Sequence, residues 1–166
     1  MATMNEIKYW HKKKDPNLNK EWISKGITSD AIKWAELFGH YLADEFKRDE
    51  TGKAQTKMFN GKLQEIKATY LTTSQLRKFF GEVRRIQNIV KTSEDNSINT
   101  TDILLLKPRL AYQVGREKDK EAKIKDFYTQ ISIALDTIEN KQHFMSFIRL
   151  LEAIVAYHKE IEPKKN

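Results

Sequence analysis

Hydrophobic residues recur every three or four positions in several stretches of the chain, most clearly in LTTSQLRKFFGEVRR at residues 71–85 and just beyond. When this stretch is turned by about 100° per residue, its apolar side chains gather on one face. These apolar positions are Leu76, Phe79, Phe80, Val83, Ile86 and Val90. The opposite face carries Arg77, Lys78, Arg84 and Arg85 around Gly81. The pattern predicts an amphipathic helix with one buried face and one basic face.

Thr72 and Gln75 predict where this helix begins, because together they form a capping-box pattern. Leu71 and Leu76 flank the cap at the spacing of a hydrophobic staple. Gly81 costs a helix interior about 1 kcal/mol relative to alanine, but it removes a side chain from the middle of the basic face. We interpret that face as a surface for phosphate groups.

Helical spacing of apolar residues predicts further helices at about 28–46, 118–138 and 140–161, capped by Thr28 or Ser29 and by Asn140 in the first and last cases. The last two are joined by few residues, so we expect an antiparallel pair. Residues 103–116, ILLLKPRLAYQVGR, contain Pro108, which lacks a backbone donor. This segment is therefore either two short helices or one helix kinked at Pro108. Lys107, Arg109 and Arg116 lie around the bend and form a second basic site.

The proportions of residue types favour an all-α fold. Hydrophobic residues make up 39% and charged residues 32% of the 166 residues, with only 6 Gly and 3 Pro, which fits a helical protein better than a turn-rich sandwich or barrel. We predict one domain over residues 1–166: a compact bundle of about five to six helices, one of them kinked at Pro108.

Two polar segments interrupt the helical pattern. Residues 1–27 are predicted to be a basic N-terminal arm, in which Tyr9, Trp10 and Trp22 favour packing against the body over stacking on bases. Residues 48–61 are predicted to be a flexible loop, with Asn60 and Gly61 at a turn. The cations in and around this loop form either a nucleic-acid contact or a solvated surface, and both readings stay open. They are Lys47, Arg48, Lys53, Lys57, Lys62 and Lys67.

Charge and residue chemistry narrow the function. The formal charge of +7 and the pI near 9.4 favour polyanionic partners. Cysteine is absent, and the four histidines lack the paired spacing of metal sites. No nucleotide-binding or serine-hydrolase motif is present, so we expect a binding protein that is no enzyme and uses no cofactor or metal. The longest strongly apolar run is 103–106, which predicts no membrane contact and a cytoplasmic location.

Three stretches together resemble the small subunit of the type III-A CRISPR effector, the Csm complex. They are LTTSQLRKFFGEVRR at 71–85, LLLKPRLAYQVGR at 104–116 and FIRLLEAIVAYHK at 147–159. The resemblance implies a small all-helical protein without catalytic activity, present in several copies that form a filament. That filament lies beside the Csm backbone subunits that hold the guide RNA. The implied partners are guide RNA, target RNA, the backbone subunits, the large polymerase-like subunit and other copies of the chain.

The candidate nucleic-acid-binding residues are Arg77, Lys78, Arg84, Arg85, Lys107, Arg109 and Arg116. Arg77 and Arg116 match motif positions of the family that the chain resembles, whereas Arg84 and Arg85 rest on helix geometry. Tyr112 is expected to pack under the bend, and Tyr157 and His158 are expected to be structural. Two alternatives remain: a free-standing helical nucleic-acid-binding protein, and a purely structural adaptor. An enzyme is the weakest reading.

Overall fold

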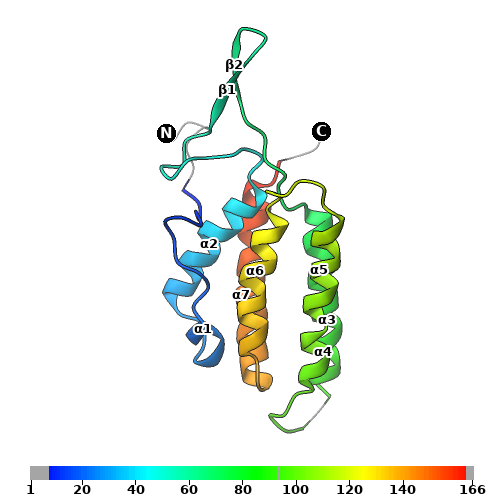
Figure 1. Ribbon diagram of the computed structural model, residues 1–166. Coiled ribbons are helices and arrows are strands. Elements are labelled where there is room, and N and C mark those ends of the chain that lie inside the picture. The colour runs from blue at the N-terminus through cyan, green and yellow to red at the C-terminus, as the bar shows by residue number, and fades with distance from the viewer. Residues whose placement is uncertain (1–7, 93, 164–166) are drawn as a thin grey trace.

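The computed structural model describes residues 8–92 and 94–163. In this part of the chain, five helices have 11 or more residues: α2 (Ser29–Ala43), α3 (Thr73–Val90), α5 (Leu106–Arg116), α6 (Ile124–Thr137) and α7 (Lys141–Ile161). The short elements are helices α1 (Glu21–Ser24) and α4 (Thr100–Leu104) and strands β1 (Thr56–Phe59) and β2 (Lys62–Glu65). The fold is mostly helical, as the sequence predicts, with a small two-stranded ribbon added (Figure 1).

Helices α6 and α7 occupy the middle of the bundle, with α1 and α2 on one side and α3, α4 and α5 on the other (Figure 1). The pair α6 and α7 is antiparallel, as their short connection predicts. Phe144, Phe147 and Leu151 of α7 are fully buried. At Gly39 of α2, an added Cβ atom would lie 2.8 Å from the carbonyl oxygen of Ile154. The backbones of α2 and α7 therefore approach too closely there for any side chain.

The helix starts follow local sequence rules. Thr28 caps α2 by accepting a hydrogen bond from the Ala31 amide, and Asn140 caps α7 by accepting one from the His143 amide. The predicted capping box of α3 is present: the Gln75 amide donates to Thr72 Oγ1 (3.1 Å), and the Thr72 amide donates to Gln75 Oε1 (2.9 Å). These side chains satisfy backbone donors that have no partner inside a first helical turn.

Pro108 breaks the helix before its own position. Helix α4 ends at Leu104 and α5 begins at Leu106, so Pro108 lies in the first turn of α5. A proline clashes with the carbonyl four residues earlier and cannot donate to it, and that carbonyl belongs to Leu104. The segment is therefore two helices separated at Leu105, and the expected kink at Pro108 is corrected to a break three residues earlier.

The described part of the N-terminal arm, residues 8–27, packs onto the bundle. Tyr9, Trp10 and Trp22 are buried, which confirms packing over base stacking. Both the Trp10 and Trp34 indole nitrogens donate to the Pro16 carbonyl at 2.9 Å. Residues 1–7 of the predicted arm lie outside the described residues.

The ribbon lies partly within the segment 48–61, which was expected to be a loop. Asn60 and Gly61 have φ values of 50° and 77°, the combination of a type I′ hairpin turn. The turn was predicted, but strand β1 was not, because its residues are exposed throughout and show no apolar alternation. The flexibility of the segment stays a prediction.

Candidate nucleic-acid interface

Helix α3 separates its side chains as the sequence predicts. Leu76, Phe79 and Val83 are buried, whereas Arg77 and Lys78 in the second turn are exposed. Arg84 and Arg85 are exposed as well, and nothing lies within 4 Å of the position where Gly81 would carry a Cβ atom. The basic face of α3 is thus open.

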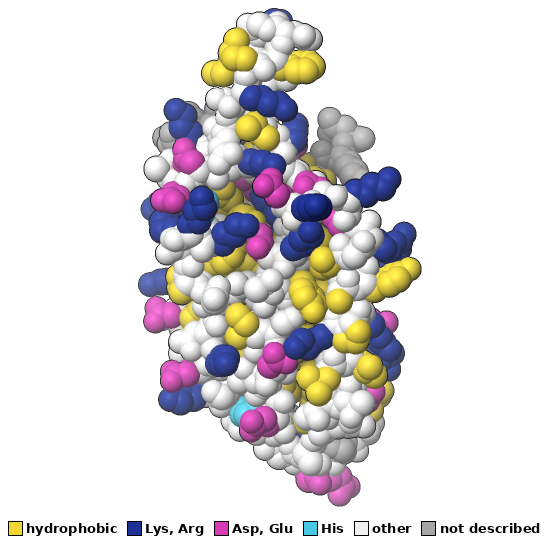
Figure 2. All heavy atoms as spheres, in the orientation of Figure 1, with side chains coloured by type: hydrophobic (Ala, Val, Ile, Leu, Met, Phe, Trp, Pro, Cys, Tyr) yellow, Lys and Arg dark blue, Asp and Glu magenta, His cyan; other side chains and the backbone are white. Residues whose placement is uncertain are grey.

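Helix α5 lies beside α3 and runs the opposite way, so α5 ends near the start of α3 (Figure 1). A groove runs along their junction. It is lined by Ser74, Gln75, Lys78, Phe79, Glu82, Leu106, Pro108, Arg109, Tyr112, Gln113, Arg116 and Glu117. Lysine and arginine side chains project along this edge of the molecule (Figure 2). Each of the two basic sites expected from the sequence thus contributes to this groove, the first through Lys78 and the second through Arg109 and Arg116. Arg77 lines a separate pocket on the α7 side of α3.

Three of the candidate cations have no ion pair or hydrogen bond with any described residue: Arg77, Lys78 and Arg116. Arg116 lies over the ring of Tyr112 at 5.9 Å, which orients its guanidinium without neutralising it. Lys78 and Arg116 line the groove together, one from each helix. Glu117 lines the same end of the groove, so its two cations and one carboxylate leave a net charge of +1 where α3 starts and α5 ends.

The other four candidate cations are paired with carboxylates. Glu82 of α3 binds Arg85 at 3.4 Å and also binds Arg109 of α5. Lys107 binds Asp136 of α6 at 2.7 Å and is partly buried. These contacts join α3, α5 and α6, so the same side chains that the sequence marks as phosphate ligands also serve the fold.

Arg84 is the most engaged of the paired cations. Its guanidinium donates to Glu152 of α7 and to Gln87, each at 3.0 Å, and lies 4.7 Å from the centre of the Phe80 ring. The side chain is about half exposed. Arg84 thus ties α3 to α7.

Tyr112 corrects one expectation. Its side chain is 66% exposed in the groove, although the flanking Leu110 and Val114 led us to expect packing under the bend. The break at Leu105 sets the direction of α5, and only Leu106 and Leu110 of this helix are buried. Ser74, Gln75 and Gln113 are further polar groove residues that the sequence analysis missed, because they carry no charge pattern.

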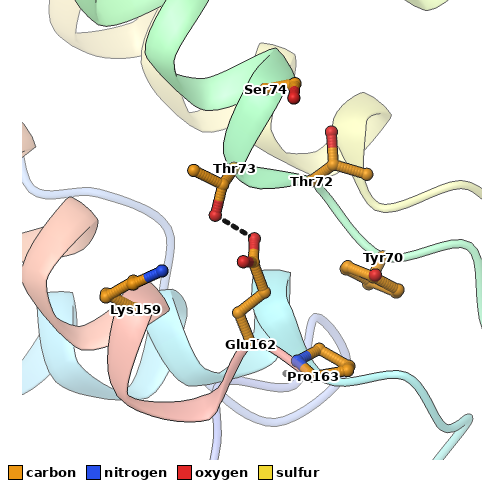
Figure 3. A pocket seen from close by; sticks show the side chains of 7 residues that line it. All are labelled: Tyr70, Thr72, Thr73, Ser74, Lys159, Glu162 and Pro163. Carbon is orange, nitrogen blue, oxygen red and sulfur yellow. Dashed lines mark hydrogen bonds between the residues drawn. The ribbon is translucent and has the colours of Figure 1, made fainter. Parts of the chain in front are cut away.

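A separate pocket lies at the first turn of α3 (Figure 3). Thr72, Thr73 and Ser74 line one side of it, and Glu162 from the end of α7 points toward them. The Thr73 hydroxyl donates to the Glu162 carboxylate. This carboxylate already occupies the positive end of the helix, which anions would otherwise favour. We therefore place the phosphate surface in the groove and not in this pocket.

His158 is structural, as expected: it is 1% exposed, and its Nε2 donates to the Leu71 carbonyl at 2.5 Å. Burial lowers the pKa of His158 below its ordinary value, more than the Leu71 hydrogen bond raises it. Because Leu71 directly precedes the capping box, this bond holds the start of α3, and with it the free end of the groove, against α7.

Lys123 is a buried cation that the sequence analysis did not single out. Its ammonium donates to the Asp44 carbonyl at 2.8 Å and lies 4.6 Å from the centre of the Tyr41 ring. Burial lowers the pKa of Lys123 to about 8, and nearby Asp44 partly opposes this. No periodic or spacing signal in the sequence marks such a residue.

Among residues 8–92 and 94–163, no three His, Asp or Glu side chains come together as a metal site would require. No helix in the same part of the chain is both long and apolar enough to span a bilayer. The fold and the groove thus define a small helical protein with unpaired cations in a groove between α3 and α5.

Comparison with known proteins identifies the family. Residues 60–164 match the family described as Csm2 Type III-A. A Streptococcus thermophilus protein named "CRISPR system Cms protein Csm2" is 36% identical over 100 residues, which cover 58% of this chain and 78% of that protein. The chain belongs to the Csm2 family of type III-A CRISPR small subunits, the family that its three motifs resemble. The groove lies entirely within the matched residues.

Proposed function

We propose that the chain is a non-catalytic RNA-binding subunit of a type III-A CRISPR ribonucleoprotein. In this role several copies form an inner filament that contacts the target RNA and the guide–target duplex in the cytoplasm. Its partners are then guide RNA, target RNA, the Csm backbone subunits, the large polymerase-like subunit and further copies of the chain. Family membership supports this partner set.

The observation that supports the RNA contact is that Lys78 and Arg116 at one end of the groove have no ion pair with a described residue. Arg77 is also unpaired, and it lies on the neighbouring side of α3, in a pocket against α7. Guide pairing supplies sequence specificity in such a complex, so a subunit that follows the duplex needs cations directed at phosphates and no base-reading code. Exposed cations without carboxylate partners meet this need without an ion pair having to break first.

A few phosphate contacts per copy bind weakly, because each exposed cation contributes little and salt screens it. Copies arrayed along one target strand add their contacts through effective concentration. A small change in the groove is therefore multiplied by the number of copies. The assembled complex is accordingly the sensitive place to test the groove.

The test is to express the tagged chain with and without the other Csm subunits and a guide RNA, and to weigh the recovered species by native mass spectrometry. Recovery in several copies with backbone subunits and guide RNA supports the proposed role. Recovery alone, with tight RNA binding by the isolated chain, supports the free-standing binder instead.

The assembled complex then receives the double substitution Lys78→Ala with Arg116→Ala, which should weaken target RNA retention at moderate salt. Lys20→Ala with Lys33→Ala removes the same charge from exposed positions outside the groove, has no ion pair with a described residue to break, and is the matched control. Equal retention by the two double variants would contradict the RNA contact. Lost assembly with unchanged RNA retention in surviving complexes would favour the structural adaptor.

A further inference from the structure

The ribbon β1–β2 stands away from the helices at the end of the bundle where α3 begins and α5 ends (Figure 1). All of its strand residues are exposed except Glu65, which is partly buried. A two-stranded hairpin alone is marginally stable in water, so its base matters. Phe46 pairs with Lys67 and Arg48 with Ala54 in isolated bridges below the strands.

Arg48 fixes this base. Its guanidinium forms a buried ion pair with Asp44 and donates to the Gly52 carbonyl at 3.0 Å. The Lys47 amide donates to the Ile66 carbonyl at 2.9 Å. The ribbon is thus held at its base, while its strands contribute no buried side chain to the core. Because the ribbon is anchored at its base and exposed along its strands, its side chains are accessible to a binding partner.

The register divides the ribbon into two chemically different faces. Residues directly opposite each other in an antiparallel pair lie on the same face, and successive residues alternate. The basic face consists of Lys57 and Gln64, paired with each other, and of Phe59 and Lys62. The apolar face consists of Thr56 and Glu65, and of Met58 and Leu63. Hydrophobic side chains at the tip are visible at the top of Figure 2.

We propose that the basic face of the ribbon binds a single-stranded segment of RNA. Phe59 stacks on an unpaired base, and Lys57 and Lys62 contact the neighbouring phosphates. This rests on the proposed function, because it takes RNA as the partner, but it assigns a contact outside the groove. Strand β1 also lies before residue 60, where the family match begins.

Charge favours RNA as the occupant. Residues 51–64 contain three lysines and no Asp or Glu, and neither Lys57 nor Lys62 has an ion pair with a described residue. The Phe59 ring is 54% exposed beside these cations. Aromatic rings with adjacent cations are the elements by which proteins hold single strands, since every base offers a stacking face. A base within a duplex is already stacked, so the segment must be unpaired.

The position of the ribbon agrees with this. It rises above α2 and α7 at the same end of the bundle where the groove carries Lys78 and Arg116 (Figure 1). A strand leaving the phosphate surface of the groove at that end would pass toward the ribbon. The groove and the basic face would then hold consecutive parts of one RNA.

The test compares neighbouring residues on opposite faces of β1. Phe59→Ala and Met58→Ala are made in the full-length chain, and binding of a short fluorescent oligouridylate is followed by anisotropy. Phe59→Ala should lower affinity at least about fivefold, the loss expected for one stacked base, and Met58→Ala should change it less than about twofold. Thermal unfolding midpoints should match for both variants.

Salt dependence tests the lysines. Lys57→Ala with Lys62→Ala should reduce the slope of log affinity against log salt by roughly 1.4, because each single-strand phosphate contact contributes about 0.7. Replacing the oligouridylate by a duplex of equal length should abolish the effect of Phe59→Ala. An effect of equal size on duplex RNA would overturn the stacking assignment.

The groove variant Lys78→Ala with Arg116→Ala is measured on the same RNA. A loss in the groove variant with unchanged binding in the ribbon variants overturns the ribbon proposal alone. No loss in either set overturns the ribbon proposal, and the proposed function is then decided separately by target RNA retention in the assembled complex. A different result would be that Met58→Ala with Leu63→Ala lowers the copy number of the assembled complex, while Phe59→Ala changes neither the copy number nor the RNA affinity. The ribbon would then bind protein, and the RNA assignment would be overturned.

Discussion

The two ends of the α3–α5 groove look alike in the sequence and differ in the structure. At one end Lys78 and Arg116 line the groove without an ion pair to a described residue, and Arg77 on the neighbouring side of α3 is unpaired as well. At the other end Arg109 lines the groove and is paired with Glu82. The nearby Arg85 is also paired with Glu82, and Lys107 is paired with Asp136. We therefore expect the two ends to differ in their capacity to bind phosphate, although the sequence gives each of them several cations.

The largest effect should come from removing the three unpaired charges, two at the free end of the groove and Arg77 beside it on α3. The triple variant Arg77→Ala, Lys78→Ala and Arg116→Ala should reduce the salt slope of single-stranded RNA binding by about 2, at about 0.7 per lost contact. The matched triple variant Arg85→Ala, Lys107→Ala and Arg109→Ala should reduce it by less than half as much. Anisotropy titrations at several salt concentrations measure both. Equal reductions of the salt slope in the two triple variants would contradict the predicted difference between the two ends.

Glu82→Gln should make the paired end of the groove resemble the free end. It removes one carboxylate and releases Arg85 and Arg109, so RNA affinity should rise about twofold to fivefold, the equivalent of an exposed ion pair. Stability should fall by less than about 1 kcal/mol. Glu36→Gln, at an exposed position of α2, is the control for the change in net charge. A fall in affinity would show that Glu82 positions the arginines for RNA.

Arg77→Ala and Arg84→Ala should separate binding from stability. Arg84 bonds Glu152 and Gln87, so Arg84→Ala should lower the free energy of unfolding by about 0.5–1 kcal/mol, the range for an exposed pair, and leave RNA affinity unchanged. Arg77→Ala should lower RNA affinity and leave the free energy of unfolding unchanged. Urea denaturation and anisotropy measure the two properties. Loss of RNA affinity in Arg84→Ala would place that residue at the RNA after all.

The smallest effect concerns pH and the start of α3. Burial lowers the folded-state pKa of His158, so on acidification the unfolded chain takes up this proton before the folded protein does. Stability should therefore fall as the pH drops through about 6.5, the ordinary histidine pKa of the unfolded chain, and should level off once the folded protein also takes up the proton. His158→Gln, which keeps a donor for Leu71, should show a shallower fall in urea denaturation. An identical pH dependence in both proteins would contradict this role.

Local rules predicted much of the fold. The capping box of Thr72 and Gln75, the Asn140 cap and the buried face of α3 depend only on residues within a few turns of each other. The break around Pro108 was also foreseen, but its position was not. The proline acts through the carbonyl of Leu104, so the break falls before the proline itself.

The division of the candidate site into free and paired cations could not be read from the sequence. Arg109 meets Glu82 across 27 residues, Lys107 meets Asp136 across 29, and Arg84 meets Glu152 across 68. Such contacts depend on how helices pack, and periodicity carries no information about them. The prediction that Tyr112 packs under the bend was wrong for the same reason, because flanking apolar residues do not show which side of α5 faces the core.

The close approach at Gly39 has a consequence for engineering. The stretch shared with relatives begins at residue 60, yet α2 lies against α7 so tightly that no side chain fits between them. Trp10 and Phe38 belong to the same core as Phe147. A fragment cut at residue 60 would bare the α2-facing side of α7 to water and should aggregate. Chimeras between relatives should therefore exchange the groove helices and leave the junction of α2 with α7 from one parent.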